Sequence, residues 1–367
     1  MIKKYTTKLL LTLFCLLLLR GGLQAQEASF AQYYYSPMHL NPALTGVFKG
    51  QYRFNVNYRQ QWSGTFADRA IRTIHTGFDY RVRVVDEDYF SFGVNAINDE
   101  TGSFARVKTM RSNLSLAYLK QLGGNRYSSV SQYLSAGLQV GVGQHFGNLD
   151  GVWFDRQYDS VNVSVNTALS SGEVIPQSNM YADYNLGLMF YTIWDEKRSF
   201  YVGASLHHLS QPNISFFGDR KEALRRRITV HTGGEIPFGK ELSILPTAMM
   251  SIQGPSMTSS FGAQLRYANL QWDDDVALRV GLQGRLANKY LSALSKDGKS
   301  VQAGTSILTD ALTLTGTLEL NRLMIGASYD MHISSIKIPT NTRGAWELSL
   351  IYTGAERRRV KTDCPRF

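Results

Sequence analysis

Apolar and polar residues alternate along much of the chain. In residues 51–59, Tyr52, Phe54, Val56 and Tyr58 alternate with glutamine, arginine and asparagine side chains. The same period of two recurs at 131–143, 275–286, 321–332 and 344–353. Because successive side chains of a β-strand point to opposite faces, these segments predict strands with one apolar and one polar face.

This pattern predicts about fourteen strands, each of roughly ten residues or more, near 51–62, 71–83, 89–98, 109–121, 131–144, 180–193, 199–209, 226–238, 241–252, 258–270, 275–286, 310–320, 321–332 and 344–354. Strands of soluble proteins usually have ~5–6 residues, whereas a tilted membrane strand needs ~9–11. The polar faces are rich in Gly, Ser, Gln and Arg, as a barrel lumen is, and aromatic residues recur near strand ends. The fold class expected is therefore all-β: a transmembrane outer-membrane β-barrel of about fourteen antiparallel strands.

The predicted connections alternate between two lengths. Those after odd-numbered strands are mostly long, at 63–70, 99–108, 145–179, 210–225, 253–257, 287–309 and 333–343. Those after even-numbered strands are mostly short, at 84–88, 122–130, 194–198, 239–240 and 271–274. Bacterial barrels have an even number of strands, long outer loops and short periplasmic turns. We therefore expect the long loops outside and both termini in the periplasm.

The N-terminus has the features of a secretion signal. Lys3, Lys4 and Lys8 precede an apolar run at 9–19, and small residues lead to a cleavage site after Ala25. The run is too short for a membrane anchor, and Cys15 lies inside it, away from a lipoprotein cleavage position. The predicted organisation is a signal peptide at 1–25, a plug segment at 26–50, the barrel at 51–354 and a periplasmic tail at 355–367.

Composition and charge narrow the range of functions. Charged residues make up 19% of the chain and aromatic residues 12%. Of the net charge of +10, four charges belong to the predicted signal peptide. The remaining excess in an exported β-protein does not indicate nucleic-acid binding. Cleavage would leave Cys364 as the single cysteine, which excludes a disulfide within the mature chain.

No catalytic or metal-binding motif is evident. His207 and His208 are adjacent on a predicted strand, so we expect them on opposite faces and unable to form a two-histidine site alone. The acidic runs 86–88 and 273–275 fall in predicted turns, where their charges would be solvated, and lack the ligand spacing of a calcium loop. No Gly-x-Ser-x-Gly element occurs. We expect no enzymatic activity, no cofactor and no metal site.

Several charged residues fall on the predicted lumen faces, and they allow two interpretations. The candidates are Arg53, Arg59, Arg111, Arg279, Arg285, Arg322 and Glu347. The arginines either line a cavity that receives an anionic group such as a carboxylate, or pair with Glu347, Asp79 and Asp330 and fill the lumen.

Residues 30–46, with the sequence FAQYYYSPMHLNPALTG, resemble the opening of the PorP/SprF family, outer-membrane proteins of the type IX secretion system of Bacteroidota. Further resemblance lies in YRQQW at 58–62, YD at 329–330, WELSL at 346–350 and the terminal CPRF at 364–367. The resemblance implies a barrel like the fourteen-stranded fatty-acid transporters, with an Asn-Pro-Ala turn in an N-terminal hatch. Here that plug motif is Asn41, Pro42, Ala43 and Gly46, where Asn-Pro favours a turn and glycine permits unusual backbone angles. The segment either caps the barrel floor or gates the lumen.

The resemblance also implies a function. Such a barrel would bind and anchor, or help to secrete, type IX substrates with a type B C-terminal signal domain, such as a large gliding adhesin. The long loop 145–179 suits a surface partner. The basic tail residues Arg357, Arg358, Arg359 and Lys361 suit a periplasmic partner, such as the lipoprotein of the secretion ring. The alternatives are docking to that ring, or an uptake channel for a hydrophobic solute; outer-membrane lipid would surround the barrel in each case.

Overall fold

The structure is a computed structural model that describes residues 27, 29–61, 71–85, 87–102, 106–124, 130–148, 152–159, 162–170, 172, 177–194, 198–216, 222–268, 276–291, 304–333, 344–354 and 365. The predicted signal peptide 1–25 lies outside these residues, as do the acidic run 273–275 and, apart from Pro365, the tail with Arg357, Arg358, Arg359, Lys361 and Cys364.

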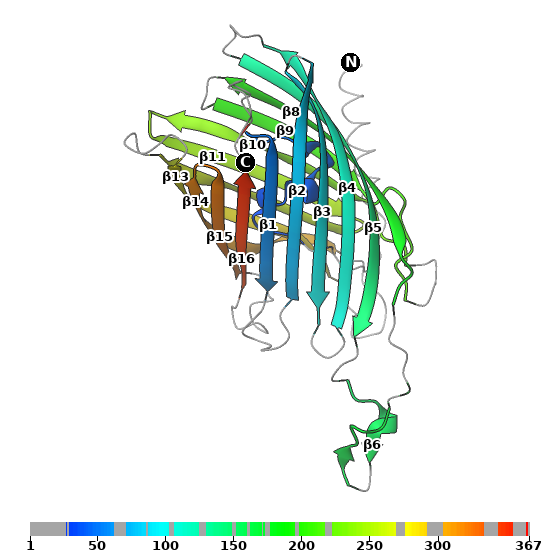
Figure 1. Ribbon diagram of the computed structural model, residues 1–367. Coiled ribbons are helices and arrows are strands. Elements are labelled where there is room, and N and C mark those ends of the chain that lie inside the picture. The colour runs from blue at the N-terminus through cyan, green and yellow to red at the C-terminus, as the bar shows by residue number, and fades with distance from the viewer. Residues whose placement is uncertain are drawn as a thin grey trace, which may run out of the picture.

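Fourteen antiparallel strands in the described chain close into one barrel, which confirms the predicted fold class (Figure 1). They are β1 (Tyr52–Gln61), β2 (Ile71–Val85), β3 (Asp88–Thr101), β4 (Arg106–Gly123), β5 (Val130–Asn148), β8 (Tyr181–Trp194), β9 (Arg198–His207), β10 (Arg227–Phe238), β11 (Leu242–Gln253), β12 (Ser256–Tyr267), β13 (Val276–Leu291), β14 (Gly304–Leu320), β15 (Leu323–His332) and β16 (Ala345–Thr353). Each strand pairs with its neighbours in chain order, and β1 closes the ring by pairing with β16.

The two ends of the barrel differ. We call the loop end the end where β1, β3, β5, β9, β11, β13 and β15 finish, and the turn end the opposite one. The short strands β6 (Tyr158–Asp159) and β7 (Ser164–Val165) form a hairpin that projects beyond the loop end, at the bottom of Figure 1. The sequence pattern did not predict this hairpin.

Some predicted boundaries were wrong. The loop predicted at 99–108 is shorter, because β3 continues to Thr101 and β4 already begins at Arg106. β12 ends at Tyr267, before the predicted limit of 270, and residues 269–275, which include the turn predicted at 271–274, lie outside the described chain. At β3 and β4, polar residues at the strand ends break the apolar alternation without breaking the backbone ladder, and so the pattern ended these strands too early.

Pro246 lies within β11, in the segment predicted as a strand at 241–252. The ladder between β10 and β11 is interrupted there, since pairs are formed at Gly233 with Thr247 and at Ile236 with Ile244 but not between them. Proline has no N–H to donate, so the gap falls where a hydrogen bond would be missing. The ladder on the other side continues, with Pro246 opposite Ala263.

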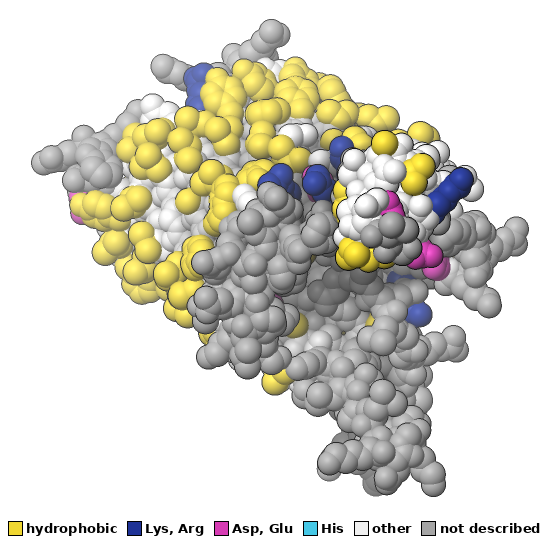
Figure 2. Space-filling view, turned by 90° about the horizontal axis from the view of Figure 1, so that it is seen from below, with side chains coloured by type: hydrophobic (Ala, Val, Ile, Leu, Met, Phe, Trp, Pro, Cys, Tyr) yellow, Lys and Arg dark blue, Asp and Glu magenta, His cyan; other side chains and the backbone are white. Residues whose placement is uncertain are grey.

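The wall of the barrel is apolar outside and polar inside. Phe78, Phe92, Leu114, Leu116 and Leu138 are among the many large apolar side chains exposed on the outer face, which is yellow in Figure 2. Buried positions of the same strands carry mainly Ser, Thr, Asn, Gln, Arg and acidic residues. This arrangement is the inverse of a soluble protein and fits a wall surrounded by lipid. No described helix is both long and apolar enough to span a membrane.

The chain before β1 lies inside the barrel (Figure 1). It forms the 3-10 turns η1 (Tyr33–Tyr35) and η2 (Pro42–Leu44) on either side of the short helix α2 (Pro37–Leu40). Almost every residue from 30 to 48 is buried. We call residues 29–50 the plug.

The plug crosses the lumen from the loop end to the turn end. Glu27 contacts Arg227, the first residue of β10, at the loop end. At the turn end, Gln51 N–H donates to the carbonyl of Gly354, just beyond β16. Glu27 and Gly354 thus lie at opposite ends of the barrel, and the expectation that both termini face the periplasm stays a prediction.

Candidate functional site

Asn41 ties the plug to two walls of the lumen. Its Oδ1 accepts a hydrogen bond from the N–H of Ala43 at 2.9 Å, which caps η2, and Pro42 occupies the first helical position. Its Nδ2 lies 3.1 Å from the carbonyl oxygen of Leu188 in β8 and 3.3 Å from that of Ala204 in β9. One amide therefore shapes the turn and attaches it to the barrel.

Lumen glycines make room for this turn. A Cβ atom on Gly137 of β5 would lie 2.3 Å from the carbonyl carbon of Pro42, and one on Gly187 of β8 would lie 1.9 Å from Asn41 Oδ1. Real Cβ atoms do not approach so closely, so only glycine lets the plug backbone touch the wall here. These glycines belong to the polar faces of the alternating pattern, but the sequence alone did not show what they accommodate.

Gly46 lets the plug turn toward the turn end of the lumen. Its φ of +79° lies in the left-handed region, and its N–H donates to Asp79 Oδ2 at 2.8 Å. The same carboxylate accepts two hydrogen bonds from Arg53, from Nε at 3.0 Å and from Nη2 at 2.7 Å. Arg53 also donates to the plug carbonyls of Leu44 and Val47. Asp79 therefore binds an N–H group of the plug backbone, and Arg53 binds two of its carbonyl groups.

A second carboxylate holds the other part of the plug. Glu347 of β16 accepts hydrogen bonds from the N–H groups of Ala31, at 2.6 Å, and Gln32, at 2.9 Å. It also pairs with Arg59 of β1, which reaches Asp330 of β15 at 2.8 Å. The carboxylates of Glu347 and Asp79 both accept hydrogen bonds from main-chain N–H groups of the plug. The charged residues of the lumen therefore bind the plug as well as one another.

The remaining lumen arginines are also paired. Arg285 contacts Asp310 at 2.7 Å and Asp330 at 3.0 Å. Arg279 and Arg266 both pair with Glu319 of β14. Of the two interpretations raised by the sequence, the described contacts of these arginines match the filled lumen. The pattern had not singled out Arg266 or Glu319.

Two residue assignments made from the sequence were wrong. Arg322 is exposed in the turn between β14 and β15 and does not face the lumen, because β15 begins only at Leu323. His207 and His208 do not lie on opposite faces: both are buried, with ring centroids 6.2 Å apart. β9 ends at His207, and a φ of +60° at His208 redirects its side chain inward.

The acidic run at 86–88 also differs from the expectation of solvated charge. Asp88, the first residue of β3, is buried at its side chain and accepts hydrogen bonds from Tyr118, at 2.8 Å, from the N–H of Gln121, at 2.8 Å, and from Lys120, at 3.2 Å. It therefore ties the start of β3 to β4. Among the described residues, no group of three or more His, Cys, Asp and Glu side chains is placed to hold a metal ion.

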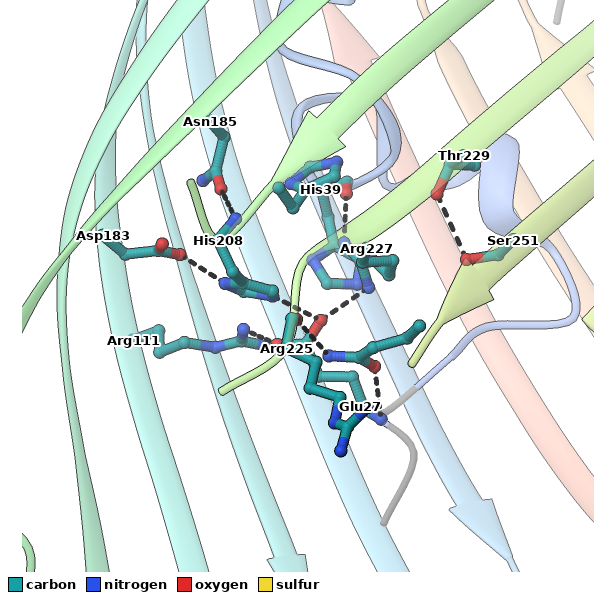
Figure 3. A network of polar contacts seen from close by, with 12 residues as sticks. Glu27, His39, Arg111, Asp183, Asn185, His208, Arg225, Arg227, Thr229 and Ser251 are labelled. Carbon is teal, nitrogen blue, oxygen red and sulfur yellow. Dashed lines mark hydrogen bonds and ion pairs between the residues drawn. The ribbon is translucent and has the colours of Figure 1, made fainter. Parts of the chain in front are cut away.

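A polar network closes around Glu27 at the loop end (Figure 3). The Glu27 carboxylate pairs with Arg111 of β4, lies 2.7 Å from Arg227 Nη1, and lies 3.1 Å from His208 Nε2. His208 Nδ1 in turn lies 2.7 Å from Asp183 of β8. Of this network, only Arg111 had been identified as a candidate lumen charge. Glu27 precedes the predicted strands, and His208 was placed on the predicted strand 199–209 without a partner.

A cavity of about 70 Å³ adjoins this network. It lies between the plug and strands β10 to β12, and its lining includes Phe30, Tyr33, Leu40 and Met249. Burial raises the pKa of the Tyr33 hydroxyl to about 12, so this side chain stays neutral.

The sequence matches the family model described as the type IX secretion system membrane protein PorP/SprF over residues 23–352. The chain belongs to the PorP/SprF family. This PorP/SprF protein is therefore an outer-membrane β-barrel of the type IX secretion system, and its secretion-system membership implies partners among the machinery or its substrates. No curated protein matches the chain.

Solved structures with a similar shape are distant in sequence. The CymD monoaromatic hydrocarbon channel is 11% identical, with a TM-score of 0.43, over 92% of this chain and 96% of that one. A TodX monoaromatic hydrocarbon channel mutant is 10% identical, with a TM-score of 0.41, over 86% and 93%. CdiB from Acinetobacter baumannii is 8% identical, with a TM-score of 0.42, over 82% of this chain. This PorP/SprF protein spans 60% of the length of that CdiB chain.

Proposed function

We propose that this PorP/SprF barrel anchors a type IX substrate with a type B C-terminal signal domain at the cell surface, and that the partner docks on the loop end. The observation that carries the proposal is the occupied lumen. The plug is buried from residue 30 to residue 48 and is held by the carboxylates of Asp79 and Glu347. A docking platform needs a rigid closed barrel, whereas a conduit for a polypeptide would require these contacts to break.

The hairpin β6–β7 supplies a surface for such a partner. Trp153, Tyr158, Val163 and Leu169 are all exposed on the segment that carries it. Exposed apolar groups clustered on a soluble projection are typical of protein-binding surfaces. The projection stands clear of the barrel wall in Figure 1, so a large secreted protein could reach it without contacting lipid.

The uptake-channel alternative receives less support. Pockets for small molecules usually have ~300–1,000 Å³. The cavity beside the plug has about 70 Å³, which is below this range. The ring-docking alternative rests on the basic tail 357–361, which lies outside the described residues and stays a prediction.

The test is affinity purification of the full-length barrel from outer membranes of a strain with an active type IX system. One variant replaces residues 152–170 with a short Gly-Ser linker. The matched control carries Val84→Ser and Val85→Ser, which alter exposed apolar residues at the turn end. We expect a secreted protein with a type B domain to co-purify with the wild type and the control but not with the loop variant.

Two results would contradict the proposal. Equal recovery of the secreted protein with the loop variant would show that the partner does not need the hairpin. Recovery of no type IX substrate with any of the three proteins would exclude anchoring altogether. Heat-modified migration on gels, which reports a folded barrel, checks that the loop variant is intact.

A further inference from the structure

Three side chains from different strands and loops meet on one carboxylate at the loop end. Arg111 comes from β4, Arg227 from β10 and His208 from the connection after β9, and all three contact Glu27 (Figure 3). Glu27 belongs to the chain's own N-terminal segment, before the first regular element of the plug. The wall thus presents a cationic site, and the N-terminal segment supplies its occupant.

The two arginines need an anion. The side chains of Arg111 and Arg227 are 8% and 11% exposed, and the Nε atom of each is buried without a hydrogen-bond partner in the described chain. Leaving a buried charge without its partner is strongly unfavourable. The site is therefore stable with a carboxylate in place and unstable when empty, so that any occupant that leaves must be replaced.

The charge balance favours one carboxylate. Asp183 offsets part of the positive charge through its contact with His208, 2.7 Å away. Arg111 and Arg227 carry two positive charges and Asp183 carries one negative charge, which leaves one positive charge of these three groups for Glu27 to neutralise. A phosphate, with a charge of about −1.5 to −2, would overcompensate this site.

The present occupant is held mainly through its carboxylate. Apart from its carboxylate, Glu27 makes one hydrogen bond among the described residues, from its N–H to Gln253 Oε1 at 3.4 Å. The plug proper is held separately from Ala31 onward, through Glu347, Asn41 and Asp79. Glu27 can therefore leave the site while the plug keeps its own contacts.

We propose that Arg111, Arg227 and His208 form a receptor for an acidic side chain of a partner peptide, and that Glu27 is its internal competitor. The occupant seen in the structure is a glutamate in an irregular peptide segment, so the site is shaped for that chemistry. The adjoining cavity includes Ser29, Gln253 and Ser256 in its lining, and Ser256 begins β12 at the loop end. Arg227 lines the same cavity. The inference goes beyond anchoring and does not depend on which protein is anchored.

The experiment supplies the occupant in trans. A fluorescein-labelled peptide with the sequence of residues 26–31, QEASFA, is titrated against the purified full-length mature barrel, and binding is followed by fluorescence anisotropy. In wild type the tethered Glu27 competes. In Glu27→Gln the site lacks its carboxylate, so we expect the peptide to bind at least tenfold more tightly. The matched peptide QQASFA should not bind either protein at the same concentrations.

Two further variants locate the site. Arg111→Gln and Arg227→Gln, each combined with Glu27→Gln, should abolish the gain, whereas Arg83→Gln at the turn end should leave it unchanged. Glu27→Asp, with a shorter side chain, should give an intermediate affinity if Glu27→Gln fails to fold. Equal binding of QEASFA and QQASFA, or no gain in either Glu27 variant, would overturn the proposal. Displacement of the peptide by equimolar acetate would reduce the site to one for small anions and would also overturn it.

Discussion

The contact between Asp79 and the plug allows a quantitative test of the structure. Asp79→Asn keeps the shape of the side chain but removes its charge. In the folded protein Arg53 would then be a buried cation without its carboxylate, and the N–H of Gly46 would lose a charged acceptor. Removing one partner of a buried pair costs about 3–5 kcal/mol.

Asp79→Asn should destabilise the docking of the plug more than the folding of the barrel. The strand ladders around Asp79 on β2 do not depend on its side chain, whereas Gly46, Leu44 and Val47 are bound by Asp79 and Arg53. At about 1.4 kcal/mol per factor of ten, the population of undocked plug should rise between a hundredfold and a few thousandfold.

The assay is thiol labelling of a buried plug position. Ala43→Cys places a small thiol at a fully buried site, and Cys364→Ser removes the other cysteine of the predicted mature chain. The labelling rate in this background is compared with and without Asp79→Asn. Arg53→Gln, which removes the other member of the pair, and the variant with both changes complete a double-mutant cycle. The destabilisation of plug docking in the double variant should be about 1–3 kcal/mol smaller than the sum of the two single effects.

Two results would refute this reasoning. A rate increase below tenfold in Asp79→Asn would mean that the pair does not hold the plug. Strict additivity in the cycle would mean that Arg53 and Asp79 act independently, despite the two hydrogen bonds between them.

Other changes give separate tests. Asn41→Ala should loosen the plug by about 1–3 kcal/mol in the same labelling assay, since Ala43 N–H and two wall carbonyls lose their partner; an unchanged rate would contradict this. Gly46→Ala should also raise labelling, because its Cβ would lie 1.9 Å from Ser91 Oγ. Adding Ser91→Ala should restore little of the loss, since the Cβ of residue 91 would still lie 2.4 Å away and the positive φ stays unfavourable. Leu116→Arg on the lipid face should weaken folding into vesicles by up to about 2–4 kcal/mol, measured by denaturant titration. Arg322→Gln should change stability by less than about 0.5 kcal/mol, and a larger loss would mean that this exposed arginine has a structural role.

The alternating pattern predicted the wall of the barrel because it is a local property. Every second side chain of a barrel strand faces lipid and must be apolar. Phe54, Leu116 and Leu138 are exposed at such positions. Each strand therefore shows its outer face within its own ten or so residues. All fourteen barrel strands were predicted for this reason, including β11 with its proline. Boundaries were less accurate, since backbone pairing continues where the side-chain pattern stops.

The partners of the lumen residues could not be read from the sequence. Arg59 of β1 meets Asp330 of β15 only because the barrel closes through β16 and aligns the strands in one register. The His208 side chain turns inward because β9 ends one residue earlier. Glu27 meets Arg111 and Arg227 because the plug crosses the whole lumen.

By itself, then, the sequence determined the strands, their two faces, the family resemblance and the presence of a turn at Asn41. Only the tertiary structure decided which charged residues hold the plug and which residues of the wall Glu27 contacts. The physical reason is the range of the interactions. Burial of an apolar face acts within one strand, whereas ion pairs across a lumen depend on closure and register, to which residues far apart along the chain contribute.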